Sequence, residues 1–314
     1  MDGLVVIVGG SGFLGRYLVQ ELAHTGVRMR IVVRTPEAAV FLKPLGGLGQ
    51  VQIVGGDVRD SVSLTRAFDG ATAGVNLVGI LAEAGKQTFS AVQADGAANV
   101  ARAAAAAGVT AFVQISAIGA SAASGARYAQ TKAAGEAGVR AALPQATILR
   151  PSIVFGPEDQ FINRFAALGK QLPVVPVVAG DTRFQPVYVV DVAKAIVAAL
   201  NNPARFGGQV FELGGPRIYT FRDIIAWILR EIRVGKPLVE VPAFAARLMA
   251  KAGDFVPGAP MTSDQYTMLQ SDNVASADGL AALGIAATPM EAIAPQYLER
   301  YRTGGRFHRD AAAS

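Results

Sequence analysis

The strongest constraint on the fold is a run of glycines between an apolar segment and an amphipathic one. Residues 4–8 are continuously apolar, which predicts a strand covered on both faces of a parallel sheet. Residues 12–25 place leucines at helical spacing. The intervening "GGSGFLG" fits two glycine patterns, which begin at Gly9 or Gly10 and continue with Gly12 and Gly15. Such a turn lets backbone N–H groups approach a pyrophosphate at a helix N-terminus, so we predict a dinucleotide phosphate loop.

Strands and helices alternate along the first half of the chain. Further strands are predicted at 28–33, 51–57, 74–79, 111–116 and 146–156, with helices over 97–108 and around 128–139. This alternation is typical of an α/β fold of Rossmann type, a doubly wound parallel sheet. Beyond Gly156 prolines become frequent and the pattern changes. We therefore expect an NAD(P)-binding domain at 1–155 and a smaller substrate or partner region at 156–314, with segments near 185–215 returning to the sheet.

The composition excludes several classes of site. The chain has no cysteine, and its two histidines, His24 and His308, have no neighbour at metal-ligand spacing. We therefore expect no metal site, and any acid–base chemistry must use tyrosine, lysine or carboxylates. The net charge of +5 is spread along the chain apart from a cluster of arginines near its end, Arg300, Arg302, Arg306 and Arg309. This distribution predicts no nucleic-acid partner and a solvated tail, with contact to anionic lipid as the alternative.

The apolar runs are shorter than the ~20 residues that a membrane-spanning helix needs. The beginning of the sequence lacks the basic start and cleavage site of an export signal. We expect a cytoplasmic protein, or one that is peripheral at the inner face of a membrane. A largely apolar helix expected at 243–252, relieved by Arg247 and Lys251, could lie on a membrane, against a partner subunit, or as a lid over the substrate region of the same chain.

The end of the second strand bears on the choice of coenzyme. An acidic residue there, ~20 residues after the glycines, takes the ribose hydroxyls of NAD. The sequence has Arg34 at this position, and Glu37 comes too late to replace the acid. A guanidinium suits a 2′-phosphate, and Arg16 could add a second cation. We therefore expect NADP(H) rather than NAD(H), the alternative being that Arg34 is a solvated residue at a strand end.

Several motifs together resemble a known superfamily. The glycine loop, "GDVRD" after the third strand, "YAQTK" and "RPSIVFG" resemble the short-chain dehydrogenase/reductase superfamily in its extended or atypical branch, over most of the chain. "RYAQTKAAGE", "RPSIVFGPEDQFINRF" and especially "PMTSDQYTMLQSDNV" are similar to a narrower group, which contains the nucleotide-binding accessory subunit of respiratory complex I and its bacterial relatives. The resemblance implies a dinucleotide cofactor and a respiratory-complex or quinone-related partner.

The resemblance also implies roles for individual positions. The residues that would hold the dinucleotide are Gly9, Ser11, Gly12, Phe13, Leu14 and Gly15 in the phosphate loop, Arg34 at the 2′-phosphate, Asp57 and Val58 at the adenine, Leu77 and Gly79 along the ribose side, Lys132 on the nicotinamide ribose, and Pro151 and Ile153 at the nicotinamide end.

In active members of the superfamily, the residue that matches Tyr128 exchanges a proton with the substrate oxygen. Lys132, one helical turn further, favours the phenolate, and a hydroxyl at the end of the fifth strand completes the site. That hydroxyl would be Ser116; if the aligned residue is instead Ala117, Ser121 or Ser124 could substitute. Two hypotheses therefore stand. The chain holds NADP(H) within a respiratory assembly, or it is an active oxidoreductase, epimerase or dehydratase acting on a small carbonyl, alcohol or lipid-like substrate.

Overall fold

The structure is a computed structural model that describes residues 3–256 and 261–302. The chain divides into two compact units, and it passes from one to the other several times. Unit 1 comprises Met1–Pro151, Val189–Gly214 and Ala275–Ala287, whereas unit 2 comprises Ser152–Tyr188, Gly215–Val274 and Thr288–Ser314. The first passage lies at Pro151.

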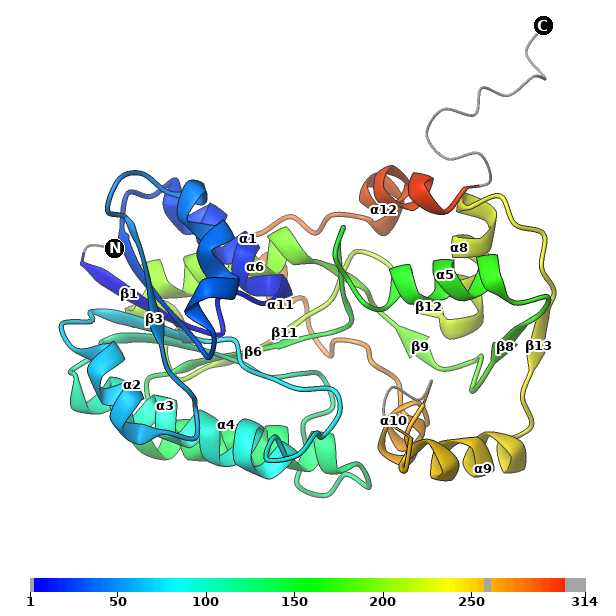
Figure 1. Cartoon of the computed structure of the whole chain (residues 1–314), viewed down its shortest axis with the longest axis horizontal. Helices are drawn as coiled ribbons and strands as arrows, with labels where there is room; N and C mark the ends of the chain where they lie inside the picture. The colour runs from blue at the N-terminus through cyan, green and yellow to red at the C-terminus, as the bar shows by residue number, and fades with distance from the viewer. Residues whose placement is uncertain (1–2, 257–260, 303–314) are drawn as a thin grey trace, which may run out of the picture. The chain divides into compact units, whose positions relative to one another are not determined.

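Unit 1 is built on a seven-stranded sheet in which every pair of neighbours is parallel (Figure 1). In spatial order its strands are β11 (Val210–Leu213), β6 (Thr147–Pro151), β5 (Ala111–Ile115), β4 (Ala73–Asn76), β1 (Leu4–Val8), β2 (Arg28–Val33) and β3 (Val51–Gly55). The order reverses at β1, which is the arrangement of a doubly wound Rossmann-type sheet. The predicted fold class is confirmed.

Helices cover both faces of this sheet (Figure 1). On one face α1 (Phe13–Ala23) packs against α6 (Val189–Asn201), and on the other α3 (Asp95–Ala106) packs between α2 (Ser61–Phe68) and α4 (Arg127–Ala142). All five residues of β1 and all five of β5 are buried, which explains the continuous apolar sequence of β1 and the mostly apolar one of β5, whose single polar residue is Gln114. Shorter elements of this unit are η1 (Pro36–Leu45), η2 (Ser90–Ala94), α7 (Pro203–Phe206) and α11 (Gly279–Ala282).

The strand predicted at 146–156 is interrupted, which corrects the sequence-based prediction. The sheet strand β6 ends at Pro151, and Val154–Phe155 forms a separate short strand, β7, that pairs with β10 (Val187–Tyr188) in unit 2. Within unit 2, the hydroxyl of Ser152 donates to the Asn273 side-chain oxygen at 2.7 Å. Because the chain turns at Ser152 to make this contact, β7 cannot continue the sheet of unit 1.

Unit 2 combines helices with short pairs of strands. Its remaining elements are α5 (Ile162–Gln171), β8 (Val175–Val177), β9 (Arg183–Phe184), β12 (Tyr219–Thr220), α8 (Phe221–Glu231), β13 (Leu238–Glu240), α9 (Ala243–Gly253), α10 (Ser263–Met268), α12 (Met290–Leu298) and η3 (Glu299–Tyr301). The core combines aliphatic side chains with aromatic rings, among them Phe184 and Phe221 at 5.7 Å between ring centroids and the buried Trp227. Burial of these apolar side chains stabilises a unit that has little sheet.

Part of the predicted basic tail is bound to unit 2. Arg302 donates from Nε to the Glu231 carbonyl at 2.8 Å, and Arg300 donates to the Pro157 carbonyl at 3.0 Å. The sequence predicted a solvated tail, whereas these two side chains are hydrogen-bonded to the main chain of unit 2. Arg306, His308 and Arg309 lie outside the described residues.

Candidate functional site

The glycine turn between β1 and α1 has the close backbone approach that the sequence predicts. A Cβ on Gly15 would lie 2.3 Å from the carbonyl oxygen of Gly10, so only glycine allows α1 to pack this closely on the turn. Gly9 has a φ of +84°, in the left-handed region that favours glycine. Gly12 is the exposed N-cap of α1, and a Cβ there would meet only the Gly9 oxygen, at 3.3 Å. The space beside Gly12 is thus open to a ligand.

The N-terminus of α1 presents a positive field beside this open space. Gly12 provides no side-chain cap, and the first turn, which includes Phe13 and Leu14, has no acidic side chain. The uncompensated helix dipole favours an anion at this end. Ser11 is half-buried in the turn. These features suit the phosphates of a dinucleotide.

Arg34 lies exposed just after β2, at the carboxyl edge of the sheet. Neighbouring β3 pairs Gly55 with Val33, which brings Asp57 close enough for Arg34 to act on it electrostatically. Both carboxylate oxygens of Asp57 accept from Arg59, at 2.9 Å from Nε and 2.5 Å from Nη2. These hydrogen bonds, helped by the charges of Arg59 and Arg34, hold the pKa of Asp57 below its usual value. Arg59 is therefore part of this corner, although the sequence reasoning did not single it out.

Two other residues expected at the adenine and phosphate ends are held by packing. The Val58 side chain is buried, and a Cβ on Gly96 of α3 would lie 2.7 Å from its Cγ2. Only the main chain of Val58 is thus available to a base. The Arg16 guanidinium carbon lies 5.3 Å from the centroid of the Phe41 ring in η1, a cation–π contact.

The predicted strand at 74–79 ends early, and its last residues form a loop at the same edge. β4 stops at Asn76, and the Leu77 amide donates to the Val8 carbonyl at 3.0 Å. Gly79 is exposed, and a Cβ there would lie 3.1 Å from the Nζ of Lys132. The loop after β4 and the lysine of α4 therefore meet, as the implied roles along the ribose require.

Lys132 is a buried cation with little hydrogen bonding. Its side chain is 7% exposed, and its Nζ donates to the Ile115 carbonyl at 3.5 Å. Burial lowers the pKa of Lys132 from 10.5 to about 8, although the charge of Glu136 opposes this. Its Nζ lies 5.8 Å from the centroid of the Tyr128 ring, one turn earlier in α4. The ring of Phe89 packs edge-on against Tyr128 at 5.9 Å.

Two buried polar atoms around Lys132 have no hydrogen-bond partner among the described residues: the Ser116 hydroxyl and the Gln93 side-chain oxygen. Ser116 directly follows β5, whose last carbonyl Lys132 contacts, and the Gln93 oxygen lies 3.6 Å from the position of a Cβ on Gly79. Unsatisfied buried polar groups are costly and rare in native structures. These two atoms make the surroundings of Lys132 a candidate functional region.

The alternatives to Ser116 are placed differently. The hydroxyls of Ser121 and Ser124 each accept from a backbone amide two residues later, at 3.2 Å. Ser121 is exposed and Ser124 is half-buried. Ser116 is therefore the buried hydroxyl nearest in sequence to the end of β5, and Ala117, which has no hydroxyl, follows it.

The residues expected at the nicotinamide end belong to different units. Pro151 is the buried last residue of β6 in unit 1, and its carbonyl accepts from the Ile118 amide at 3.2 Å. Ile153 lies in unit 2, where its carbonyl accepts from the Val187 amide at 2.9 Å.

An ion-pair network connects α4 to the sheet strands β6 and β11. Arg150 of β6 binds both oxygens of Glu136, at 2.8 Å and 2.7 Å, and lies 3.6 Å from Glu212 of β11. A bidentate pair of this kind fixes the register of α4 on the sheet, and with it the positions of Tyr128 and Lys132. The sequence reasoning missed these residues. The signal was the glutamate of "YAQTKAAGE", which is four residues after Lys132 and so on the same face of the helix.

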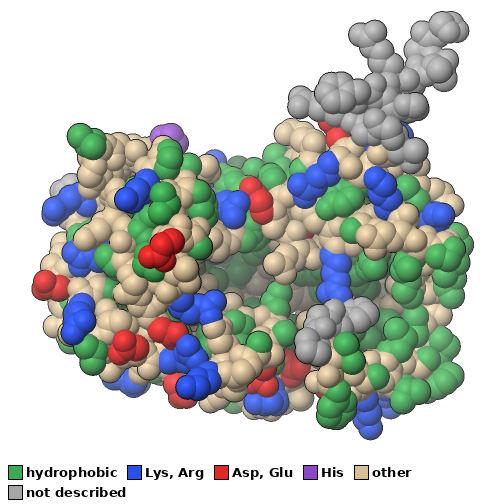
Figure 2. Space-filling model, in the orientation of Figure 1, with side chains coloured by type: hydrophobic (Ala, Val, Ile, Leu, Met, Phe, Trp, Pro, Cys, Tyr) green, Lys and Arg blue, Asp and Glu red, His purple; other side chains and the backbone are tan. Residues whose placement is uncertain are grey.

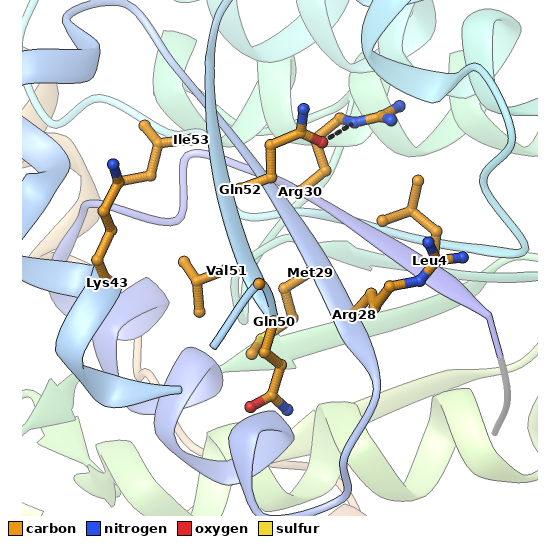
Figure 3. A pocket seen from close by; sticks show the side chains of 10 residues that line it. Leu4, Arg28, Met29, Arg30, Lys43, Gln50, Val51, Gln52 and Ile53 are labelled. Atoms are coloured by element: carbon orange, nitrogen blue, oxygen red, sulfur yellow. Dashed lines mark hydrogen bonds between the residues drawn. The ribbon is translucent and has the colours of Figure 1, made fainter. Parts of the chain in front are cut away.

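A hollow of about 430 Å³ lies at the amino ends of β1 and β2, opposite the carboxyl ends where the glycine turn lies (Figure 3). Its wall includes Leu4, Arg28 and Lys43, and Arg30 reaches across to the Gln52 oxygen at 2.8 Å. None of the residues implied in dinucleotide binding lines it. Since ligands of doubly wound sheets bind at the carboxyl ends of the strands, we place the functional site at the opposite edge.

Across residues 3–256 and 261–302, His, Asp and Glu form no cluster of three that could hold a metal ion. Within the same two ranges, no helix combines the length and the apolar character that crossing a membrane requires.

Residues 5–214 match the model of the NAD dependent epimerase/dehydratase family. The chain is 35% identical over 320 residues to the mitochondrial NADH dehydrogenase [ubiquinone] 1 alpha subcomplex subunit 9 of Arabidopsis thaliana, covering 97% of this chain and 80% of the relative. The Mus musculus subunit of the same name is 34% identical, with coverage of 96% and 82%. A ceramide reductase of Caulobacter vibrioides is 37% identical over 242 residues, which are 76% of this chain and 74% of the relative.

Solved structures share the fold at low sequence identity. The dTDP-glucose 4,6-dehydratase DesIV of Streptomyces venezuelae, with NAD bound, superposes with a TM-score of 0.73 at 20% identity, covering 95% of this chain and 96% of the dehydratase. A UDP-glucose 4-epimerase of Thermotoga maritima gives 0.71 at 17% identity, with coverage of 96% and 98%. These likenesses establish the fold alone.

Proposed function

Because this chain belongs to the NAD dependent epimerase/dehydratase family, whose members bind a nicotinamide dinucleotide, we propose that it binds NADP(H) at the carboxyl edge of the unit 1 sheet. The observation that carries the proposal is the open glycine turn at the N-terminus of α1, which has neither a side-chain cap nor an acidic residue in its first turn and lies at the same edge of the sheet as Lys132. The dinucleotide would thus be held at both ends.

The phosphate end accounts for the preference for NADP(H). Gly12 and the first turn of α1 would take the pyrophosphate, and Arg34 would take the 2′-phosphate. Asp57, on which Arg34 acts electrostatically, is already paired with Arg59, so it does not compete for Arg34 as a free acid. A cation at the tip of β2 with a satisfied carboxylate beside it favours an added negative charge over a ribose hydroxyl.

The nicotinamide end would be held by residues of α4 and of the loop after β4. Lys132 would donate to the ribose hydroxyls, beside the exposed loop at Gly79, and Gln93 offers a buried acceptor. Pro151, at the end of β6, would lie beside the nicotinamide. Leu77 and Gly79 would follow the ribose on the β4 side.

Mass spectrometry of the nucleotide that copurifies with the full chain tests this proposal, followed by calorimetry with NADPH and NADH. Arg34→Glu should weaken NADPH binding at least tenfold and leave NADH binding nearly unchanged, because a phosphate would then face a carboxylate. Arg28→Glu is the matched control, since Arg28 is exposed at the other end of the same strand. Equal losses in both variants, or no heat with either coenzyme, would refute the proposed site.

The relatives suggest where the coenzyme is used. Because the Arabidopsis and mouse relatives are named as subunits of NADH dehydrogenase [ubiquinone], we place this chain in a respiratory complex I or quinone-related assembly, where it holds NADP(H) without needing turnover. NADH:quinone reductase activity that elutes with the tagged chain from detergent-solubilised membranes would support this assignment. Elution of the chain without that activity, from cells that contain the complex, would contradict it.

A second candidate function is the reduction of a carbonyl or lipid-like substrate, favoured by the retained Tyr128, Lys132 and Ser116 and by the likeness to a ceramide reductase. The nicotinamide would supply the hydride to the substrate carbon. Ser116 would donate to the substrate oxygen, Tyr128 would give that oxygen its proton, and the nearby Lys132 cation would stabilise the phenolate that remains.

Turnover separates the two functions. If the chain is a reductase, purified protein should oxidise NADPH with a carbonyl substrate, and Tyr128→Phe should lower kcat at least 100-fold while NADPH affinity survives. Tyr301→Phe, in η3, serves as the control. Tight NADPH retention with no oxidation across a panel of carbonyls, quinones and oxidised sphingolipids would leave the cofactor-holding function.

A further inference from the structure

Helix α9 in unit 2 packs on its neighbours through small side chains. Ala246, Ala250 and Gly253 are its buried residues, spaced by four and three positions along one face. Ala246 and Ala250 contact a small cluster that includes Tyr266. This face uses no large side chain of the helix, so its large apolar residues must lie elsewhere.

The opposite face carries those large residues in the open. Phe244 is 78% exposed and Leu248 is 68% exposed. Each lies two positions from Ala246, about 200° around the helix axis, and so points away from the packed face. Phe255 and Val256, just after the helix, are 87% and 57% exposed. Figure 2 shows hydrophobic side chains gathered over α9, at the lower right.

Cations accompany these apolar side chains. Arg247 and Lys251 are exposed and lie one turn apart, on the flank of the face that carries Leu248. Residues 243–253 contain no aspartate or glutamate. Asp254, directly after the helix, accepts from the Ser263 amide at 2.8 Å and thus has a structural role. The outer surface therefore combines large apolar groups with two cations of the helix, Arg247 and Lys251.

We propose that the outer face of α9, formed by Phe244, Leu248, Arg247 and Lys251, binds the surface of a membrane that contains anionic phospholipid. Eleven residues of helix extend about 16 Å, too short to cross a bilayer but suited to lie in its interface. The aromatic and aliphatic side chains enter the headgroup boundary, and the two cations, on long aliphatic stems, meet the phosphates.

Charge argues for lipid over a second copy of this chain. In a two-fold symmetric pair the same patch meets itself, so the cations of one copy would approach those of the other. An anionic bilayer has the complementary charge, and it accepts apolar side chains without requiring a matched groove. The proposal goes beyond the proposed coenzyme site, because α9 belongs to unit 2 and contains none of the residues assigned there.

Vesicle flotation of the full chain tests the proposal, without added coenzyme. Vesicles of phosphatidylcholine with phosphatidylglycerol should float the protein, and vesicles of phosphatidylcholine alone should bind it at least tenfold more weakly. Phe244→Ser with Leu248→Ser should reduce binding at least tenfold. Arg247→Gln with Lys251→Gln should reduce it about fivefold for each cation, with the effect lost at high salt.

Matched control variants test whether the protein adsorbs nonspecifically to vesicles. Leu48→Ser with Val62→Ser removes exposed apolar side chains of unit 1, and Lys170→Gln with Lys194→Gln removes two exposed cations. Both controls should float like the parent, and all variants should keep its melting temperature and NADPH affinity. Absence of flotation, flotation that the α9 variants retain, or a parent dimer that the Phe244 and Leu248 changes dissociate would each overturn the proposal. Loss of coenzyme binding with intact flotation would refute only the proposed function.

Discussion

The buried charge of Lys132 makes a quantitative prediction about stability. Burial lowers its pKa from 10.5 to about 8, and each pKa unit corresponds to about 1.4 kcal/mol. At neutral pH the cation therefore destabilises the ligand-free protein by roughly 3 kcal/mol. Lys132→Met keeps an unbranched chain of similar length and removes the charge. We expect its unfolding free energy to exceed that of the parent by roughly this amount at pH 7.

The same pKa shift predicts how the stability difference between the parent and Lys132→Met changes with pH. Between pH 8 and 10.5 the unfolded chain still holds the proton on Lys132, whereas the folded protein has released it. Since stability rises with pH wherever the unfolded state binds more protons, the parent gains stability through this window relative to the variant. The advantage of Lys132→Met should therefore be full below about pH 8 and nearly gone above about pH 10.5.

Urea unfolding of the coenzyme-free full chain, measured at several values of pH from 6 to 10.5, gives the difference directly. Titration of other groups occurs in both proteins and cancels. Lys194→Met, at an exposed position of α6, is the matched control and should show a small difference that does not change with pH. A stability difference for Lys132→Met that is also independent of pH would refute the assignment of a desolvated cation.

Three further predictions concern the same edge of unit 1. Gly15→Ala should cost about 1–3 kcal/mol in thermal unfolding because its Cβ meets backbone, whereas Gly12→Ala should melt like the parent and lose NADPH affinity in calorimetry. Glu136→Gln should cost about 2 kcal/mol, because its half-buried arginine partner keeps only the 3.6 Å contact with Glu212; Glu240→Gln, in an exposed pair, should cost under about 1 kcal/mol. Ser116→Ala should raise the unfolding free energy of the ligand-free protein by about 1 kcal/mol, since an unsatisfied hydroxyl is removed. In thermal or urea unfolding, three results would contradict the packing or hydrogen bonding described: Gly12→Ala less stable than Gly15→Ala, Glu240→Gln less stable than Glu136→Gln, or Ser116→Ala less stable than the parent.

The alternation of strand and helix in unit 1 was predictable because strands buried on both faces are mostly apolar. β1 is apolar throughout, and β5 is apolar apart from the buried Gln114. The break between β6 and β7 was not predictable from the sequence, because "TILRPSIVFG" is apolar on both sides of Ser152. What ends the strand is a hydrogen bond from Ser152 to Asn273, 121 residues away in the sequence. A contact at that separation leaves no local pattern.

The glycine positions of the candidate site could be predicted because close backbone approach requires glycine. The polar residues around Lys132 could not be recognised in the same way. Gln93 stands between Phe89 and Ala97 on the buried face of η2 and α3, and a polar residue at such a position was a signal that a periodicity search could have used. The engagement of Asp57 by Arg59 depends on loop conformation, which spacing alone does not determine.

The repeated passage of the chain between the units has a consequence for biosynthesis. β11 is the last strand of the unit 1 sheet, and it pairs with β6 only after the whole segment Ser152–Tyr188 of unit 2 has been made. A nascent chain on the ribosome therefore carries an uncovered β6 edge while the first part of unit 2 emerges. Truncation near residue 155 would leave the same edge exposed for good, so the nucleotide-binding unit cannot be produced by cutting the gene at the end of its first segment.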